Sequence, residues 1–180
     1  MTRRLPLPRP FARFFRREDG TVTVEFALML PFVFTIFLSS FELGMLLTRN
    51  VMLDRGLDIA VREVRLGTLT PLTEEALRER ACDAAVIIPD CENQLRLEMR
   101  PLDPRNFSNI PAEADCIDRG NPETPLREFI AGISNQLMII RACVLFDPMS
   151  PVAGLGKVFA DARADGAYAL VSTAAYVVEP

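Results

Sequence analysis

The feature that most constrains this 180-residue chain is an apolar run near its N-terminus. The run extends from Phe26 to Leu47 and contains a single charged residue, Glu42. As a helix that rises about 1.5 Å per residue, the run measures about 33 Å, which is enough to cross a hydrocarbon core of roughly 30 Å. We therefore expect a single-pass membrane protein in which this helix contacts the lipid bilayer.

The residues on either side of the run predict its orientation. Residues 1–20 carry six arginines, whereas the arginines that follow the run alternate with acidic residues. Basic residues beside a span favour the cytoplasmic side, so we expect the N-terminus inside and the C-terminus outside. A cleaved secretory signal is the alternative, but its apolar region is usually about 7–15 residues long and ends in a small-residue cleavage site. Here the run is longer and Thr48-Arg49-Asn50 follows it, which favours a retained span.

Helical periodicity continues beyond the apolar run. Leu53, Leu57, Ala60 and Val64 are separated by four, three and four residues, which places them on one face of a helix. We predict one long helix over residues 22–66, kinked at Pro31 because proline removes a backbone hydrogen bond.

The remaining residues predict an α+β fold with a small antiparallel sheet. We expect a helix over residues 73–86, a half-buried strand over 94–100, a long loop over 101–125, a strand over 136–146, a connector to residue 164 and a strand over 168–178. The predicted organisation is a basic cytoplasmic leader (1–20), a transmembrane and amphipathic helix (21–67) and an extracytoplasmic domain (68–180).

Four cysteines follow the span, at positions 82, 91, 116 and 143. An even number of cysteines in an oxidising compartment indicates two disulfides, for which three pairings exist. We prefer Cys82–Cys91, which closes a short loop and leaves Cys116–Cys143. Free buried thiols are the alternative, and the spacing does not match the C-x-x-C pattern of zinc sites, so no metal is expected.

The composition argues against an enzyme. The chain has no histidine and a single lysine, Lys157, so the commonest general base is missing. Residues 154–157, Gly-Leu-Gly-Lys, resemble part of a phosphate-binding loop without its strand-loop-helix context. We expect no catalytic residues, no cofactor and no nucleic-acid partner.

Two carboxylates are the candidate functional groups, because an ionisable residue in a span is costly and usually functional. Glu25 stands at the start of the apolar run and Glu42 near its outer end. The structural alternatives are that Glu25 only marks the inner interface and that Glu42 reaches the outer interface, where Arg49 follows at i+7.

The sequence around Glu25 resembles a known processing site. Residues 20–26, Gly-Thr-Val-Thr-Val-Glu-Phe, are similar to the cleavage site of Flp-type prepilins and pseudopilins, in which cleavage follows a glycine and the fifth mature residue is Glu, followed by Tyr or Phe. The chain further resembles the TadE-like family of tight adherence (Tad) pilus assembly proteins. The matching segments are residues 24–28 with Pro31, Glu42-Leu43-Gly44 with Leu in place of Phe, residues 60–65, and the C-terminal residues 176–180 with Val178 in place of Asn.

This resemblance implies a minor pseudopilin or accessory membrane subunit for assembly or initiation of a Tad/Flp-type (type IVc) pilus, in adherence and biofilm formation. It implies cleavage between Gly20 and Thr21 by a prepilin peptidase, and a location in the bacterial inner membrane with the domain in the periplasm. The implied partners are other pilin or pseudopilin subunits and the inner-membrane assembly platform. The expected subunit-packing residues are Glu25, Phe26, Pro31, Glu42 and Gly44. The alternative function is a membrane-anchored periplasmic binding domain unrelated to pili.

Overall fold

The computed structural model describes residues 21–106, 110–121, 125, 127–150, 154–163 and 165–180. Its elements are the helices α2 (Thr21–Arg65), α3 (Glu74–Ala84), α4 (Cys91–Gln94) and α5 (Leu155–Ala160), and the strands β1 (Leu95–Pro101), β2 (Leu137–Phe146) and β3 (Tyr168–Val177). The chain divides into two compact units, residues up to Leu38 and Ser39–Pro180, so that α2 belongs to both. The α+β class predicted from the sequence is confirmed.

The long helix α2 ends where the sequence predicts. Gly67 has a positive φ of 65°, and the N–H groups of Gly67 and Thr68 donate to the carbonyls of Val64 and Glu63 at 3.1 and 3.0 Å. This pair of bonds is the Schellman arrangement, which satisfies the last helical carbonyls and favours glycine at the left-handed position. Pro31 lies inside the helix, where the expected kink stays a prediction.

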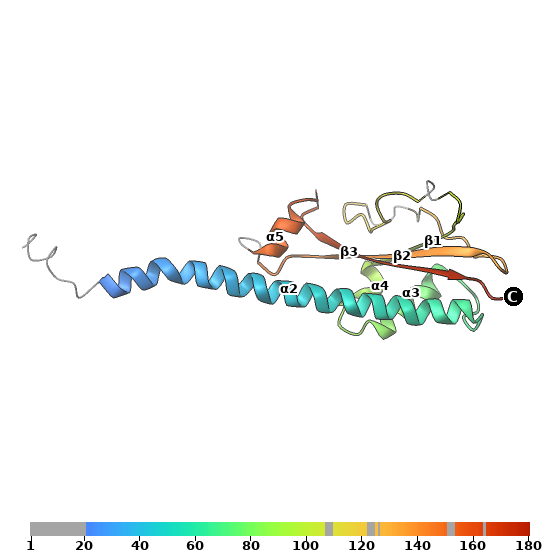
Figure 1. The fold of residues 1–180 in the computed structure, drawn as a ribbon, viewed down its shortest axis with the longest axis horizontal. Coiled ribbons are helices and arrows are strands. Elements are labelled where there is room, and N and C mark those ends of the chain that lie inside the picture. The colour runs from blue at the N-terminus through green and yellow to red at the C-terminus, as the bar shows by residue number, and fades with distance from the viewer. Residues whose placement is uncertain (1–20, 107–109, 122–124, 126, 151–153, 164) are drawn as a thin grey trace, which may run out of the picture. The chain divides into compact units, whose positions relative to one another are not determined.

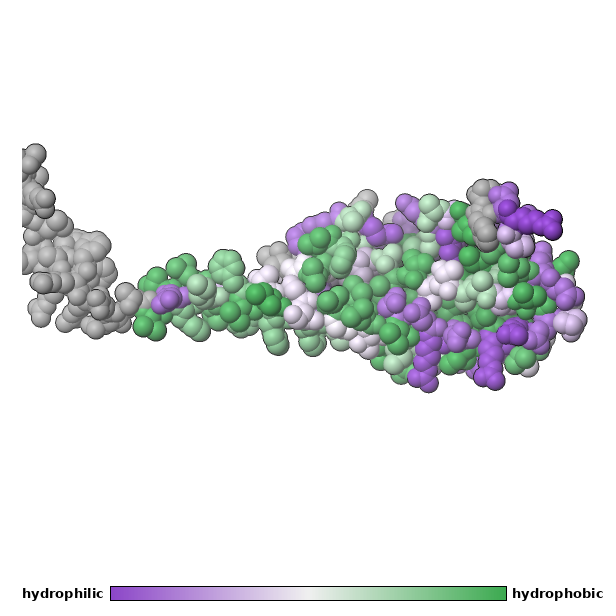
Figure 2. Space-filling view, viewed as in Figure 1, coloured by the Kyte–Doolittle hydropathy of each residue, from purple (hydrophilic) through white to green (hydrophobic). Residues whose placement is uncertain are grey.

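The first part of α2 exposes apolar side chains. Among the described residues, this helix alone is long and apolar enough to cross a membrane, and the residues of its most apolar window are exposed. Figure 2 shows the predominance of hydrophobic residues along this part of the helix. A surface of this kind is unfavourable in water and favourable in lipid.

The sheet is antiparallel, with strand order β1-β2-β3. Leu97 lies opposite Ala142 in β2, and Ala142 lies opposite Ser172 in β3. The three predicted strands are therefore present, and their bounds agree with the prediction to within a residue or two. Figure 1 shows the strands extending along the second half of α2.

One face of the sheet packs on α2 and α3 to form the main core. The predicted helix face is buried, with Leu53 and Leu57 each 1% exposed. The core residues of the strands are Leu95, Leu97, Met99, Met138, Ile140, Ala142, Val144, Phe146, Tyr168, Leu170 and Tyr176. A Cβ on Gly56 would collide with the carbonyl oxygen of Ala81, so glycine at this position lets α3 approach α2 closely.

The prediction that the first strand is half-buried is wrong, because both faces of β1 are covered. The loop after β1 covers the polar face and supplies partners for its charges. Arg96 pairs with Asp115 at 3.2 Å, and Glu98 pairs with Arg141 of β2. The period-2 pattern identifies a polar face correctly but cannot show that a loop will cover it.

Two disulfides fasten this domain, Cys82–Cys91 and Cys116–Cys143, with Cα–Cα distances of 5.6 and 5.1 Å. This is the pairing preferred from the sequence. The first bridge closes the segment between α3 and α4. The second joins the loop that covers β1 to the middle of β2, so the covering loop is held where Asp115 can reach Arg96.

Candidate functional site

The buried carboxylate of Glu42 is the most distinctive polar group on α2. Its side chain is 3% exposed although the residue lies in an apolar sequence. Oε1 accepts a hydrogen bond from the backbone N–H of Met149 at 2.9 Å, and Oε2 accepts one from the N–H of Gly156 at 2.9 Å. A buried carboxylate is stabilised when backbone amides donate to both oxygens. Glu42 thus attaches α2 to the segment between β2 and β3.

Two glycines make room for this carboxylate. A Cβ on Gly156 would overlap the Glu42 carboxylate, and a Cβ on Gly154 would lie 2.8 Å from Oε2. Gly154 also has a φ of 119°, a conformation in which other residues are strained. It is the N-cap of α5 and provides no side-chain acceptor, so Glu42 supplies the acceptor for the first turn of that helix. The Gly-Leu-Gly-Lys sequence therefore surrounds a carboxylate of the same chain.

Arg49, which follows Glu42 at i+7, contacts the ends of two strands. Its guanidinium lies 4.6 Å from the ring centroid of Phe146 and donates to the hydroxyl of Tyr168 at 3.1 Å. The rings of Phe146 and Tyr168 stack with centroids 5.9 Å apart. The cation–π contact and the stacked pair fix this turn of α2 against β2 and β3.

These contacts shorten the part of α2 that is free to meet lipid. The apolar run extends to Leu47, but Glu42 is buried in the domain and Leu46 packs against its core. The exposed stretch from Val22 to Phe41 is about 20 residues, or roughly 30 Å of helix, which matches the thickness of a bilayer core. The apolar sequence beyond Phe41 reflects packing in the domain as well as lipid contact.

Glu25 has a very different environment. Its side chain is exposed, and no hydrogen bond or ion pair joins it to another residue in the described part of the chain. The neighbouring helical positions carry Val22, Leu28 and Met29, which are 75%, 65% and 60% exposed. A charge on such a surface is costly in lipid unless a partner neutralises it. Any partner of Glu25 must therefore come from outside the described part of this chain.

The other predicted site residues lie along the same helix. Phe26 is 63% exposed, and Pro31 accepts a hydrogen bond at its carbonyl from the hydroxyl of Thr35 at 2.8 Å. A Cβ on Gly44 would meet nothing within 4 Å in this chain. Thr21 is the first described residue of α2, whereas Gly20 lies outside the described residues. Subunit packing by these residues and by Glu42 stays a prediction.

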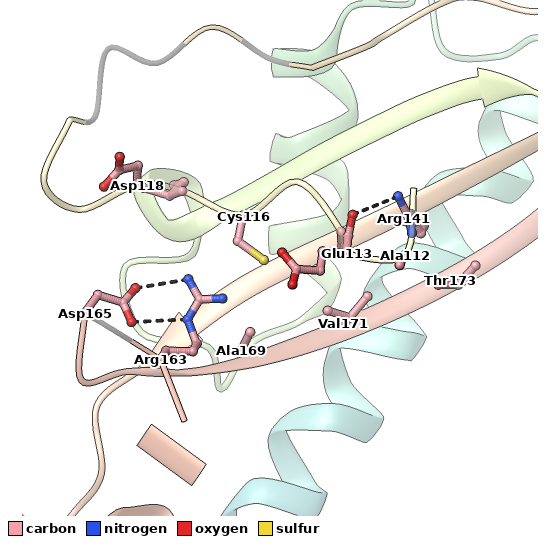
Figure 3. Close-up of a pocket in the computed structure, with 12 residues that line it drawn as sticks. Ala112, Glu113, Cys116, Asp118, Arg141, Arg163, Asp165, Ala169, Val171 and Thr173 are labelled. Carbon is pink, nitrogen blue, oxygen red and sulfur yellow. Dashed lines mark hydrogen bonds and ion pairs between the residues drawn. The ribbon is translucent and has the colours of Figure 1, made fainter. Parts of the chain in front are cut away.

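An open groove of about 780 Å³ lies on the face of the sheet opposite to α2 (Figure 3). The arginines that line it have partners in the described part of the chain. Arg163 donates twice to Asp165 at 3.1 Å, and these hydrogen bonds lower the pKa of the Asp165 carboxyl. Arg141 donates to Glu98 and to the carbonyls of Pro111 and Glu113. Arg163 and Arg141 are thus neutralised within the domain, whereas the carboxylates of Glu113 and Asp118 also line the groove.

A long helix with an exposed apolar section, joined to a disulfide-bonded α+β domain, defines a protein that one N-terminal helix can anchor in a membrane. Comparison with known families finds a similarity in the N-terminal part of the chain. Residues 20–62 match the family model described as TadE-like protein, which confirms the resemblance seen in the sequence. The match supports a Tad pilus-associated role of the pseudopilin type in general terms. No curated protein and no solved structure matches the chain.

The partners of Glu42 and Arg49 were not predicted from the sequence. Glu42 is 107 residues before Met149 and 114 before Gly156, and its acceptors are satisfied by backbone amides, which leave no side-chain pattern. The paired glycines of residues 154–156 were the one available signal, since two glycines flanking a helix start indicate close approach by another group.

Proposed function

We propose that this protein is a minor pseudopilin or accessory membrane subunit that acts in assembly or initiation of a Tad/Flp-type pilus. The observation that carries the proposal is the TadE-like match over residues 20–62. The matched segment includes the candidate cleavage site, Gly20 and Thr21, and the carboxylate of Glu25. It therefore contains the residues that we propose for processing and for contact with neighbouring subunits.

Glu25 would fix the register between the packed helices of neighbouring subunits. Its carboxylate is exposed among apolar side chains and has no partner in the described part of the chain. A cation on a neighbouring subunit, such as the N-terminal amine freed by cleavage, would neutralise it in the apolar environment. Because only one alignment of the helices brings these charges together, the pair would select that alignment.

The proposed location is the bacterial inner membrane, with the N-terminus in the cytoplasm and the domain in the periplasm. The arginine-rich leader supports this orientation, as do the two disulfides, which persist in oxidising compartments. The proposed partners are other pilin or pseudopilin subunits, the assembly platform and the prepilin peptidase. The role is structural rather than enzymatic, because the sequence lacks histidine and any recognisable catalytic constellation.

The test combines processing with piliation. N-terminal sequencing of the membrane-extracted protein should give a mature chain that begins at Thr21. Deletion of the protein should reduce piliation, and the wild-type chain should restore it. In cells with an active prepilin peptidase, a chain that keeps residues 1–20, together with normal piliation after deletion, would contradict the proposal and favour a membrane-anchored binding domain unrelated to pili.

A further inference from the structure

The two edges of the sheet differ in their backbone hydrogen bonding. The β1 edge is closed. Met99 donates to the carbonyl of Glu128 at 3.0 Å and accepts from the N–H of Ile130 at 2.9 Å. Native proteins close sheet edges in this way because an unpaired edge is a template for another strand.

The β3 edge is open. In an antiparallel pair, backbone groups of alternate residues point toward the partner strand. The N–H of Val178 donates to the carbonyl of Gln136, the residue before β2, at 3.1 Å. The N–H and C=O groups of the even-numbered residues of β3 therefore point toward β2. The odd-numbered residues from 169 to 177 therefore direct their N–H and C=O groups outward. In the described part of the chain, these groups have no hydrogen-bond partner.

The side chains of β3 offer no protection against pairing. Residues 168–177 contain no charge and no proline, the usual means of blocking an edge. Val171 and Val177 are 43% and 47% exposed. The charges beyond each end are already paired, Arg163 with Asp165 and Arg65 with Glu179. A segment that pairs with β3 thus meets an uncharged edge about ten residues long, and matches it best if it is uncharged itself.

Space exists for both faces of an added strand, whose side chains alternate between the two faces of the sheet. On one face lies the groove of about 780 Å³ that contains Ala169, Val171 and Thr173 (Figure 3). On the other face, a groove of about 470 Å³ lies between β3 and α2. Ile59 and Leu66 contribute apolar surface to it, and Asp58 and Arg62 line its α2 side. The two grooves together could receive the alternating side chains.

The direction of β3 argues against a second copy of this chain as the occupant. Arg49 contacts Tyr168 at the start of β3, and Arg65 pairs with Glu179 just beyond its end, so β3 and α2 point the same way. Two β3 edges pair symmetrically only when antiparallel, because the bonds of a parallel ladder are offset. Such a dimer would point the two α2 helices in opposite directions, which one membrane does not permit. This step rests on the anchoring included in the proposed function.

We propose that the outer edge of β3 is a strand-accepting interface that pairs with an extended, uncharged segment of a different polypeptide. Main-chain hydrogen bonds to the odd-numbered residues provide affinity, and the two grooves receive the alternating side chains. The interface is separate from Glu25, so the subunit contacts one neighbour through its membrane helix and another through its sheet.

Site-specific photo-crosslinking in the full chain tests this interface. A photoreactive residue replaces Ala175, which is exposed on β3, and membranes of the producing cells are irradiated. We expect one adduct with a different polypeptide, and mass spectrometry should map it to an uncharged segment. Hydrogen exchange on the purified complex should show slower exchange at Val171 and Thr173 than in the isolated protein, by about tenfold or more for each bond gained.

Matched variants distinguish pairing from mere proximity. Val171→Pro removes an outward N–H without removing a bond to β2, and Thr173→Lys places a charge on the edge. Each should reduce the adduct about tenfold, the effect of losing one or two hydrogen bonds. The controls Val171→Thr and Thr173→Val should leave the adduct unchanged, and all four proteins should keep both disulfides.

Three results would overturn the interface: no adduct, an adduct with a second copy alone, or an adduct that both blocking variants leave intact. If Val171→Pro fails to fold, Thr173→Lys decides. The proposed pilus function fails separately, since unprocessed protein and normal piliation after deletion would not affect the adduct.

Discussion

The carboxylate of Glu42 accepts a hydrogen bond from the backbone N–H of Gly156, a residue 114 positions further along the chain. The same carboxylate accepts from the N–H of Met149. A carboxylate that would be costly on the surface of an apolar helix is thereby hydrogen-bonded inside the domain. Glu25 has no such partner in the described part of the chain. The two acidic residues of the apolar region therefore have different roles.

Glu42→Gln should destabilise the domain. The amide nitrogen of Gln would face a backbone N–H in place of an acceptor, and leaving that buried donor unsatisfied costs about 1–3 kcal/mol. The free energy of unfolding in detergent should fall by that amount, and the amides of Met149 and Gly156 should exchange faster with solvent. Unchanged exchange at both amides would contradict the assignment of Glu42.

Gly156→Ala should have a similar effect, because the added Cβ would enter the space of the Glu42 carboxylate. Gly44→Ala is the matched control, since among the described residues no atom outside the adjacent helix backbone lies within 4 Å of its added Cβ. Alanine is favoured over glycine within a helix by about 1 kcal/mol, so Gly44→Ala should leave the free energy of unfolding unchanged or higher. Thermal unfolding of both variants in the same detergent makes the comparison.

Glu25→Ala should impair assembly without impairing the subunit. The change removes a charge from an apolar surface, so membrane insertion should not suffer. We expect normal protein levels and both disulfides, with fewer surface pili and weaker adherence. Electron microscopy of cells that carry the variant as sole copy, beside an immunoblot, measures both quantities. Normal piliation would mean that Glu25 only marks the membrane interface, and loss of the protein would indicate a role within the subunit.

Removal of the Cys116–Cys143 bridge should cost more than removal of Cys82–Cys91. The bridges span 27 and 9 residues, and loop-closure entropy predicts contributions of about 3.6 and 2.6 kcal/mol. Paired Cys→Ala variants should therefore differ by about 1 kcal/mol in the free energy of unfolding. Equal losses would show that strain or residual structure in the unfolded chain dominates the entropic difference. Peptide mass spectrometry of unreduced protein checks that the remaining bridge forms.

Because of Glu74, the free energy of unfolding should decrease as pH rises above the ordinary pKa of a glutamate. Burial raises the pKa of its carboxyl, and the charge of Arg78 opposes that effect. Because the folded state then binds the proton more tightly than the unfolded state, stability is lost as pH rises from the unfolded pKa through the folded pKa. Relative to the parent, Glu74→Gln should gain stability as pH rises above about 4, where an ordinary glutamate ionises. A constant difference across this range would contradict the assignment.

The helix and strands were predictable because each follows a local pattern. Thr73 caps α3 by accepting the N–H of Ala76 at 3.2 Å, as expected for a threonine before acidic first-turn residues. The period-4 and period-3 steps around Leu53 and Leu57 identified the buried face of α2. Three features depend on contacts between distant residues and were not predicted from the sequence: the cover over β1, the amide donors to Glu42 and the open edge of β3.

The docking of Glu42 gives α2 a fixed insertion depth. In a bilayer, the helix can sink only as far as the bulk of the domain held at Glu42 allows, and the exposed stretch before it is about as long as a hydrocarbon core is thick. Because the domain is held at Glu42, the helix cannot slide along its axis to accommodate a thicker or thinner membrane. The length of helix available to lipid is therefore set by the residues before Glu42, because Glu42 itself is held by the amides of Met149 and Gly156.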